Sequence, residues 1–382
     1  MGQTSEFMRF FRKSRFFRFC LVAGLLVLSS CMKSGPMDEE RLALGAAGDA
    51  VFVVCEGNFM YGNASLDCYI PSEKRIENNV FARANAIDLG DVAQSMTIFG
   101  GRGYVVINNS GIIFIVDPAT CRVTGAVTGL GSPRYILPVS ASKAYVTDLY
   151  AASIAIVNPA TGRVTGHIAT PDHPSTEQMA QWGGRVFVSC WSYDDKILAI
   201  DTTTDTIAGE IEVGRQPSSL VVDRNGKLWV LTGGSEGGSG QSGAFEGEAP
   251  ALWCIDAATM TVEQRLNFAP GDSPSRLCLN GSGDTIYYLD THSNGGSNSS
   301  SGGGVWRMDV ADRSLPATPV ITPDPAERTL FYALGVDPRT SEIYVGDAID
   351  YNQPGVVYRY SAEGALSDKF RVGIIPGSFC FR

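Results

Sequence analysis

The segment RGYVVINNSGIIFIVDPATCRVTGAVTGL, residues 102–130, shows the design of the whole chain. It contains two alternating apolar runs, a tight turn at residues 117–120 and a third alternating run. Alternation with a period of two is typical of strands that bury one face. Asp117 and Pro118 favour a turn because aspartate hydrogen-bonds its own backbone and proline presets φ. Residues 143–169 repeat this design with Asn158 and Pro159 at the turn, so the sequence predicts an array of similar units.

Equivalent turns recur at intervals of roughly 40 to 55 residues, which is the range of propeller blades. They lie at Ile70-Pro71, Asp117-Pro118, Asn158-Pro159, Asp201-Thr202, Asp256-Ala257, Asp309-Val310 and Ser361-Ala362. Two short strands precede each turn and two follow it, with no helical periodicity. The sequence therefore predicts an all-β fold, a seven-bladed β-propeller of four-stranded blades over residues 50–382.

The two ends of this domain predict how the ring closes. The run beginning at Val51 has the pattern of the second strand of a blade, which leaves that blade without its innermost strand. The final residues, IPGSFCF at 375–381, match the inner-strand pattern QPSSLVV at 216–222. We expect the carboxyl-terminal strand to join the first blade and so remove a free sheet edge.

Loop lengths predict which face of the propeller binds a ligand. Successive connections of an up-and-down blade lie on opposite faces, and one set here is uniformly short. The other set is long and irregular and includes residues 56–64, 83–94, 233–250 and 292–304. Loops on a rigid scaffold usually carry function, so we expect the site on the long-loop face. Within it we select Tyr135, Trp191, Tyr193 and Tyr351 for apolar contacts, and Arg134 and Asp148 for polar contacts.

The charge balance excludes one class of partner. Five of the 30 basic residues and one of the 40 acidic residues precede Cys31, so 25 basic side chains face 39 acidic ones beyond it. A nucleic-acid or anionic-lipid surface would be rich in lysine and arginine. We therefore predict no nucleic-acid partner, and a membrane association through a lipid anchor alone.

The amino terminus reads as a targeting segment. Five basic residues precede a short apolar run, Leu21 to Leu28, that is too short to span a bilayer as a mature helix. The run ends in Leu-Ser-Ser-Cys at 28–31, which resembles the lipobox of bacterial lipoproteins. The resemblance implies a signal peptide at 1–30, lipidation of Cys31 and a tether at 31–49. An ordinary secretory signal with a chance cysteine is the alternative.

The sequence predicts no metal site and no catalytic group. None of the three histidines has a partner at zinc-ligand spacing. Seven cysteines follow Cys31 without regular spacing, and small buried hydrophobe is the expected role. Two alternatives stay open: a Cys55–Cys380 disulfide, and a calcium site formed by Asp347, Asp350 and Asn352.

Several longer strings carry a family resemblance, among them CEGNFMYGNASLDCY at 55–69, SPRYILPVS at 132–140 and GVDPRTSEIYVGDAIDY at 335–351. They resemble the YncE-like, DUF5074-type surface propellers of Bacteroidetes, across nearly the whole chain beyond the tether. Within this family the chain is similar to BtuG-type lipoproteins, which capture cobalamin and sit over the TonB-dependent transporter BtuB.

The resemblance implies a non-enzymatic protein of the outer membrane, lipid-anchored at the cell surface and without a cofactor of its own. It would bind a corrinoid of the vitamin B12 type and deliver it to a BtuB-like TonB-dependent transporter. Two alternatives remain: a propeller of the same family that binds another ligand or acts as an interaction scaffold, and a lyase-type enzyme. A binding titration with cyanocobalamin and cobinamide separates them.

Overall fold

The computed structural model describes Leu42, Leu44 and residues 49–235, 238–240, 243–245, 247–290, 304–324 and 329–382. The predicted signal peptide, Cys31 and most of the predicted tether lie outside these residues. Within the described part, strands dominate and no helix is long and apolar enough to cross a membrane.

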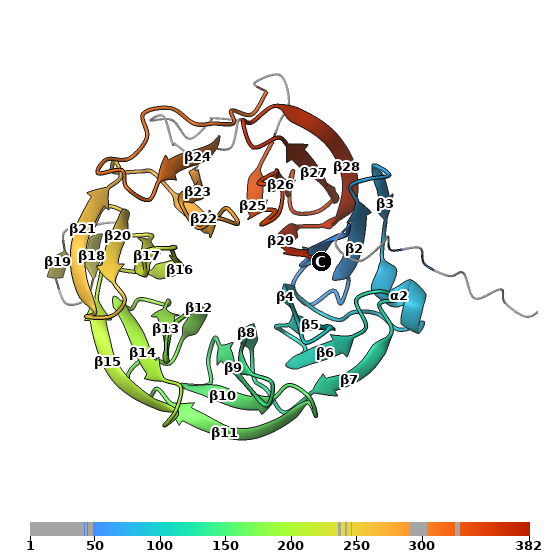
Figure 1. Cartoon of the computed structure of the whole chain (residues 1–382), viewed down its shortest axis with the longest axis horizontal. Helices are drawn as coiled ribbons and strands as arrows, with labels where there is room; N and C mark the ends of the chain where they lie inside the picture. The colour runs from blue at the N-terminus through green and yellow to red at the C-terminus, as the bar shows by residue number, and fades with distance from the viewer. Residues whose placement is uncertain are drawn as a thin grey trace, which may run out of the picture. The chain divides into compact units, whose positions relative to one another are not determined.

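Seven sheets lie around a central axis like the blades of a propeller (Figure 1), which confirms the predicted fold. The first sheet has the order β29-β1-β2-β3 and so combines the two ends of the domain. Its strands are β29 (Pro376–Phe381), β1 (Val51–Cys55), β2 (Ser65–Ile70) and β3 (Arg75–Glu77).

In each of the next three blades the strands follow the order of the chain, from the innermost strand to the outermost one (Figure 1). The second contains β4 (Ala93–Phe99), β5 (Arg102–Ile107), β6 (Ile112–Val116) and β7 (Val123–Val127). The third contains β8 (Pro133–Ser140), β9 (Lys143–Asp148), β10 (Ser153–Asn158) and β11 (Arg163–Ala169). The fourth contains β12 (Thr176–Trp182), β13 (Arg185–Cys190), β14 (Lys196–Asp201) and β15 (Thr206–Glu212).

The last three blades carry the longer connections. The fifth contains β16 (Pro217–Val222), β17 (Lys227–Thr232), β20 (Ala251–Asp256) and β21 (Thr261–Asn267). The sixth contains β22 (Pro274–Leu279), β23 (Thr285–Asp290) and β24 (Gly304–Asp309), and a single bridge from Val305 to Ile321 lies at its outer edge. The seventh contains β25 (Phe331–Val336), β26 (Ile343–Asp347), β27 (Pro354–Tyr360) and β28 (Leu366–Ile374).

The ring closes as the sequence predicts. β29 pairs antiparallel with β1, with Phe381 opposite Val51 and Cys380 opposite Phe52. The backbone N–H of Arg382 then donates to the carbonyl of Ala50 at 3.0 Å. Without β29 the inner edge of β1 would expose unpaired backbone groups.

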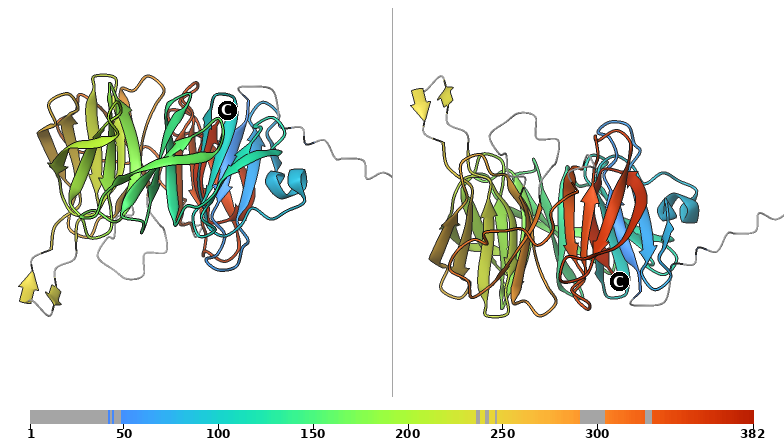
Figure 2. Two further views of the ribbon diagram at one scale, coloured as in Figure 1. Left: turned by 90° about the horizontal axis from the view of Figure 1, so that it is seen from below. Right: turned by 90° about the horizontal axis from the view of Figure 1, so that it is seen from above.

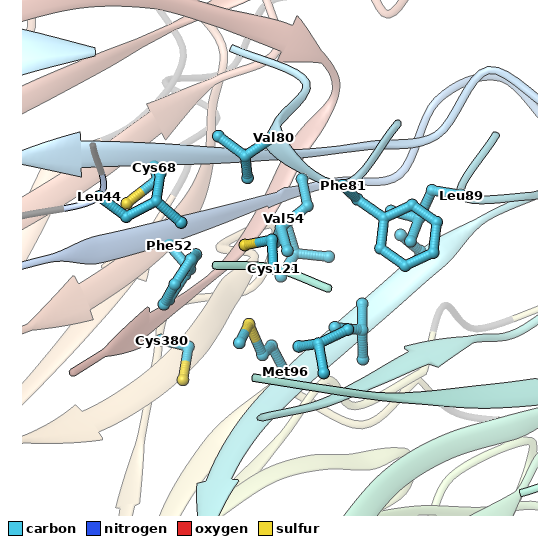
Figure 3. Close-up of a cluster of buried hydrophobic side chains, with 14 of the residues drawn as sticks. Leu44, Phe52, Val54, Cys68, Val80, Phe81, Leu89, Met96, Cys121 and Cys380 are labelled. Carbon is cyan, nitrogen blue, oxygen red and sulfur yellow. The ribbon is translucent and has the colours of Figure 1, made fainter. Parts of the chain in front are cut away.

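The hydrophobic core is divided into seven clusters, and each cluster lies between two neighbouring blades. Figure 3 shows the cluster between the first and second blades, where Phe52 of β1 and Met96 of β4 are buried together. Both faces of each sheet are therefore covered, which explains the runs of consecutive buried residues in the second strands, such as the five buried residues of β1.

A short helix, α2 (Val80–Asn85), lies in a segment where the sequence predicts only loop. Val80 and Phe81 bury their side chains in the first core cluster, and the ring of Phe81 lies 4.9 Å from that of Phe114. The helix has six residues, too few for its 3.6-residue pattern to emerge from one sequence.

The turns quoted above follow one recurring geometry on the face of the short connections. The carboxylate of Asp117 accepts a hydrogen bond from the backbone of Ala119, and Asp201 and Asp256 cap their turns in the same way. Figure 2 shows that the hairpin of β18 (Gly238–Gly240) and β19 (Gly243–Phe245) projects from the opposite face of the disc, away from the carboxyl terminus. The long connections thus share one face, which we name the mouth face.

Candidate functional site

Each inner strand has an irregular register near the mouth face, where the sheet accommodates extra residues. The shifts lie at Ala93/Ser95, Pro133/Ile136, Thr176/Met179, Pro217/Ser219, Ser275/Cys278, Phe331/Ala333 and, on the strand facing β29, at Val54/Cys55. Bulges of this kind redirect side chains and end regular pairing. Here the shifted segments contain the polar residues Gln94, Arg134, Glu177, Ser218, Arg276 and Tyr332.

In the first blade, the inner strand contributes no side chain at the equivalent position, and a loop residue takes its place. Its inner strand has Gly377 in the shifted segment, and a Cβ added there would lie 2.4 Å from Oε1 of Glu56. Glu56, which follows β1, therefore occupies the space that Gly377 leaves open. Its carboxylate accepts a hydrogen bond from the hydroxyl of Tyr332 at 3.2 Å.

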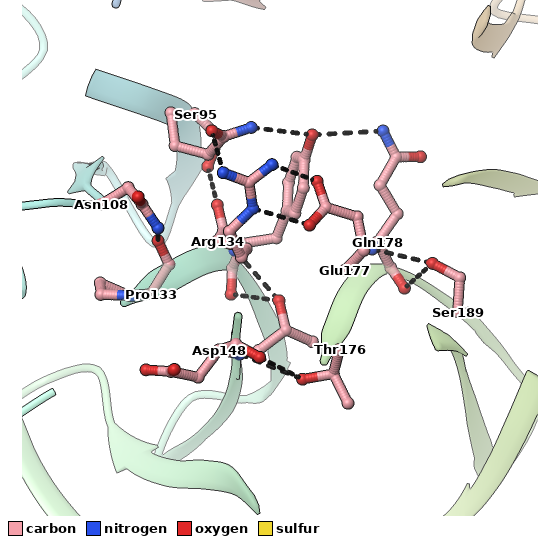
Figure 4. Close-up of polar contacts among 12 residues, drawn as sticks. Ser95, Asn108, Pro133, Arg134, Asp148, Thr176, Glu177, Gln178 and Ser189 are labelled. Atoms are coloured by element: carbon pink, nitrogen blue, oxygen red, sulfur yellow. Dashed lines mark hydrogen bonds and ion pairs between the residues drawn. The ribbon is translucent and has the colours of Figure 1, made fainter. Parts of the chain in front are cut away.

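We call the space around the central axis, which the inner strands surround, the channel. On one side of its opening at the mouth face, polar side chains form a hydrogen-bonded network (Figure 4). Arg134 donates from Nε and Nη2 to the two oxygens of Glu177, at 2.6 and 2.7 Å, and from Nη1 to the side-chain oxygen of Gln94 at 2.7 Å. The side-chain amides of Gln94 and Gln178 each lie 3.4 Å from the hydroxyl of Tyr135. Each of the three guanidinium nitrogens thus donates one hydrogen bond, and the pair with Glu177 is bidentate.

The other side is more open and contains Arg276, Tyr332 and Glu56. The guanidinium of Arg276 lies 4.9 Å from the ring centre of Tyr332, and its Nε donates to the Tyr332 carbonyl at 2.9 Å. Burial raises the pKa of the Glu56 carboxyl above its ordinary value, while the positive charge of Arg276 opposes that rise. Burial also raises the pKa of the Tyr332 hydroxyl.

These two sides enclose a cavity of about 390 Å³ at the end of the channel. Side chains of the inner strands and of four mouth-face loops line it: Arg134, Tyr135, Glu177, Gln178, Trp191, Ser218, Ser219, Ser273, Ser275, Arg276, Leu330, Phe331, Tyr332 and Tyr351. The volume lies near the lower end of the range for small-molecule sites. Aromatic faces and hydrogen-bonding groups alternate around it.

Exposed aromatic side chains surround this cavity on the mouth-face loops. Of the ten large hydrophobic residues that are exposed in the described part of the chain, seven lie on these loops: Ile87 and a group of six, Phe59, Met60, Tyr61, Tyr150, Tyr193 and Tyr351. Exposed aromatic groups clustered on one face commonly mark a binding surface. We name these six residues the aromatic rim.

Four of the six residues selected from the sequence line the cavity, namely Arg134, Tyr135, Trp191 and Tyr351. Tyr193 belongs to the rim instead, with 84% of its surface exposed. Asp148 is buried, and its carboxylate accepts hydrogen bonds from the backbone N–H groups of Ser132, Tyr150 and Ala151. Its carboxylate thus holds two mouth-face loops in place, a role that differs from the expected ligand contact.

Sequence reasoning places Arg276 on the long-loop face without choosing it as a ligand contact, and it did not select Glu56 or Glu177. A signal for Glu177 exists, because SPRY at 132–135, STEQ at 175–178 and SPSR at 273–276 occupy equivalent positions at the start of inner strands. When these strings are aligned, Glu177 and Arg134 occupy the same position in neighbouring blades, so their side chains are expected to lie close together. No such signal exists for Glu56, because it follows β1 and not the inner strand β29, where Gly377 lacks a side chain.

The structure also gathers a group that sequence spacing did not indicate. His173, Cys190 and Asp194 each bring one potential ligand atom within 4.8 Å of the others. Nδ1 of His173 lies 2.7 Å from Asp194, and its Nε2 lies 3.5 Å from Glu210. The group connects the loop before β12 to the loop after β13 at the edge of the mouth face.

The structure bears on the two alternatives that the sequence left open, a Cys55–Cys380 disulfide and a calcium site at Asp347, Asp350 and Asn352. Cys55 lies opposite Pro376 rather than opposite Cys380, and both cysteines are free. Asp347 is buried and accepts hydrogen bonds from the backbones of Leu330 and Ile349. These bonds give Asp347 a structural role within its loop.

Fold and site together define a seven-bladed β-propeller with a polar cavity at one end of its channel and an aromatic rim around it. The family described as "Domain of unknown function (DUF5074)" matches residues 49–372, and the chain belongs to this family. The family-level resemblance of the sequence is thereby confirmed. No curated protein sequence matches the chain significantly.

Solved structures with the same fold are distant in sequence. A quinonprotein alcohol dehydrogenase-like protein of Bacteroides thetaiotaomicron is 14% identical, with a TM-score of 0.63 over 87% of this chain and 78% of that one. Hydrazine synthase of Kuenenia stuttgartiensis is 14% identical, with a TM-score of 0.58 over 75% and 89%. The Pan2 WD40 domain of Neurospora crassa is 15% identical, with a TM-score of 0.51 over 76% and 79%. Likeness at this level of identity concerns the fold alone.

Proposed function

We propose that this protein is a cell-surface lipoprotein that binds a corrinoid on the mouth face and delivers it to a TonB-dependent outer-membrane transporter. The aromatic rim is the observation that supports this proposal most directly. A corrinoid is wide, nearly planar and fringed with amides, so it requires ring faces and hydrogen-bonding groups over a broad area. The rim and the polar cavity offer both, in the arrangement typical of small-molecule sites.

The dimensions of the site determine how such a ligand would bind. A cavity of about 390 Å³ can accept one substituent of a macrocycle but not the macrocycle itself. The corrin ring would therefore lie across the mouth, in contact with Tyr193 and Tyr351, while a substituent enters between Trp191 and Tyr332. Because the blades already hold these side chains, little conformational entropy is lost on binding, which favours high affinity.

A second candidate function is that of a protein-interaction scaffold, and one loop of the rim favours it. Phe59, Met60 and Tyr61 are consecutive and exposed by 64%, 75% and 79%. The loop is ordered by hydrogen bonds from the Met60 N–H to the carboxylate of Asp91, at 2.9 and 3.0 Å. An ordered loop with three large exposed apolar side chains is suited to bind a protein partner.

Calorimetric titration of the protein with cyanocobalamin and with cobinamide tests the corrinoid proposal. We expect saturable binding, and we expect Trp191→Ala or Tyr351→Ala to cost about 2 kcal/mol because each removes a central aromatic contact. Arg122→Ala and Arg163→Ala, on the face of the short turns, are the controls and should bind like the wild type. Absence of binding by the wild type would contradict the corrinoid proposal and favour the scaffold.

A further inference from the structure

Arg276 is held in the channel by an unusual backbone conformation. Its φ angle is 60°, in the left-handed region that residues with a side chain rarely adopt. Such conformations cost free energy and persist where the surrounding structure requires them, often at binding sites. In this case the conformation belongs to the irregular start of β22 and places an arginine beside Tyr332 at the wall of the cavity.

The contacts of Arg276 leave most of its donors unused. Among the described residues, only Nε has a hydrogen-bond acceptor, the Tyr332 carbonyl, and no carboxylate oxygen lies within 4.0 Å of the guanidinium. Arg134, on the opposite wall, instead donates from all three of its nitrogens, two to the carboxylate of Glu177 and one to Gln94. A guanidinium without a carboxylate partner is available to bind an anion in two-point geometry.

Four serines line the same cavity. The side chains of three of them, Ser218, Ser273 and Ser275, make no hydrogen bond to any other described residue, whereas Ser219 accepts one from the backbone of Leu277. A serine hydroxyl donates one hydrogen bond and rotates to suit its acceptor. Arginine and serine donors around one cavity are the groups that recognise phosphate and carboxylate oxygens.

We propose that Arg276, with Ser218 and Ser275, forms a subsite for an oxyanion group, a phosphate or a carboxylate, of the ligand that the mouth face holds. This inference rests on the mouth face as the binding face and not on the ligand being a corrinoid. The anion enters from the mouth and pairs with the terminal nitrogens of Arg276, while Tyr332 supports the back of the guanidinium.

Glu56 makes this binding dependent on pH. The positive charges of Arg276 and Arg134 favour the charged form of the Glu56 carboxyl, and the negative charge of Glu177 disfavours it. The carboxylate also accepts a hydrogen bond from the hydroxyl of Tyr332. An anion bound beside Glu56 favours the protonated carboxyl, so binding takes up a proton. By linkage, the affinity for the anion rises as the pH falls.

Sulfate is the probe of choice because its charge is constant between about pH 5 and about pH 8. Calorimetric titrations at both pH values, with sodium chloride to hold the ionic strength constant, should show tighter binding at the lower pH. Arg276→Gln should weaken sulfate binding about tenfold or more, and Arg276→Lys should have an intermediate effect because it keeps the charge but loses the two-point geometry. Arg265→Gln is the matched control, since Arg265 also stacks on an aromatic ring, Trp253, at 4.6 Å.

Glu56→Gln separates a binding role from a structural one. It should tighten sulfate binding at about pH 8 and abolish the pH dependence, an effect opposite to that of a generally damaged site. Methyl phosphate and acetate, titrated in the same way, identify which oxyanion the subsite prefers. Sulfate binding that Arg276→Gln leaves unchanged, or that is absent in the wild type, would overturn the inference. Loss of corrinoid binding with sulfate binding intact would instead contradict only the proposed function.

Discussion

Among single residues, Gly377 decides which side chain of the first blade approaches the site. Its position on β29 corresponds to positions that hold Arg134 and Glu177 in other blades, and all six of those blades carry a side chain there. Atoms Oε1, Cγ and Cδ of Glu56 lie 2.4 to 3.0 Å from the place of a Cβ on Gly377. The whole end of the Glu56 side chain would have to move to admit a methyl group.

Gly377→Ala is therefore expected to lower the free energy of unfolding by about 1–3 kcal/mol, the usual cost of overpacking. Chemical denaturation measures it. The control is Gly184→Ala, since a Cβ at Gly184 meets nothing within 4 Å. Because the two residues are in contact, the double variant Gly377→Ala/Glu56→Ala should recover part of the loss. Additive effects of the two substitutions would show that Glu56 does not fill the space above Gly377.

Glu56 also predicts a dependence of stability on pH. Burial raises its pKa in the folded protein above the ordinary value of 4.5, so the folded state retains a proton that the unfolded chain has released. The free energy of unfolding contributed by this group is therefore highest below that ordinary value and falls as the pH rises through the folded pKa. Denaturation at several pH values should show Glu56→Gln becoming more stable relative to the wild type as the pH rises. A difference that is constant with pH would contradict the assignment.

Among the elements, β29 is the one on which closure of the ring depends. It pairs with β1 over five residues and packs between the inner strands β4 and β25. The rings of Phe379 and Phe381 lie 6.0 and 5.5 Å from that of Tyr344 in the seventh blade. One strand thus supplies hydrogen bonds to its own blade and apolar contacts to a neighbouring one.

Deletion of residues 375–382 should expose the edge of β1 and open two blade interfaces. We expect an insoluble protein or a large fall in the thermal midpoint, because unpaired edges aggregate and buried aromatic contacts are lost. Removal of the projecting hairpin β18–β19, which adds its strands to no blade, is the comparison and should leave the midpoint almost unchanged. A truncated protein that melts like the full-length chain would disprove this account of closure.

In the whole molecule, the side chains that hold the fold together and those that line the candidate site lie at different distances from the central axis. Seven apolar clusters between the blades hold the ring together, while polar groups on the inner strands face the channel. A ligand at the mouth face therefore contacts a scaffold that is held together mainly by the apolar clusters between the blades. Substitutions in the aromatic rim should change affinity more than they change stability.

The proposed location of the protein at the outer membrane rests on lipidation of Cys31. If this cysteine is acylated, Cys31→Ala should abolish labelling by radioactive fatty acid and release the protein from the membrane fraction, because the acyl chains are its anchor. Cys20→Ala, directly before the apolar run, is the matched control and should retain the label. Continued labelling of Cys31→Ala would remove the lipoprotein proposal.

The fold could be predicted from the sequence alone because the period-two strands and the tight turns between them are local signals that recur seven times, and five of these turns begin with Asp or Asn. The same repetition revealed closure by the final strand and the division into a short-turn face and a mouth face. Arg134, Tyr135, Trp191 and Tyr351 could be selected from it because they lie where strands or their loops reach that face.

Only the tertiary structure decided how the charges are paired at the channel mouth. Arg134 and Glu177 are 43 residues apart, and Tyr332 lies 276 residues from Glu56. No local pattern shows that one arginine is paired with a carboxylate while Arg276 is not. The reason is geometric: ring closure brings the starts of seven distant strands to one axis, and irregular register determines which side chains meet there.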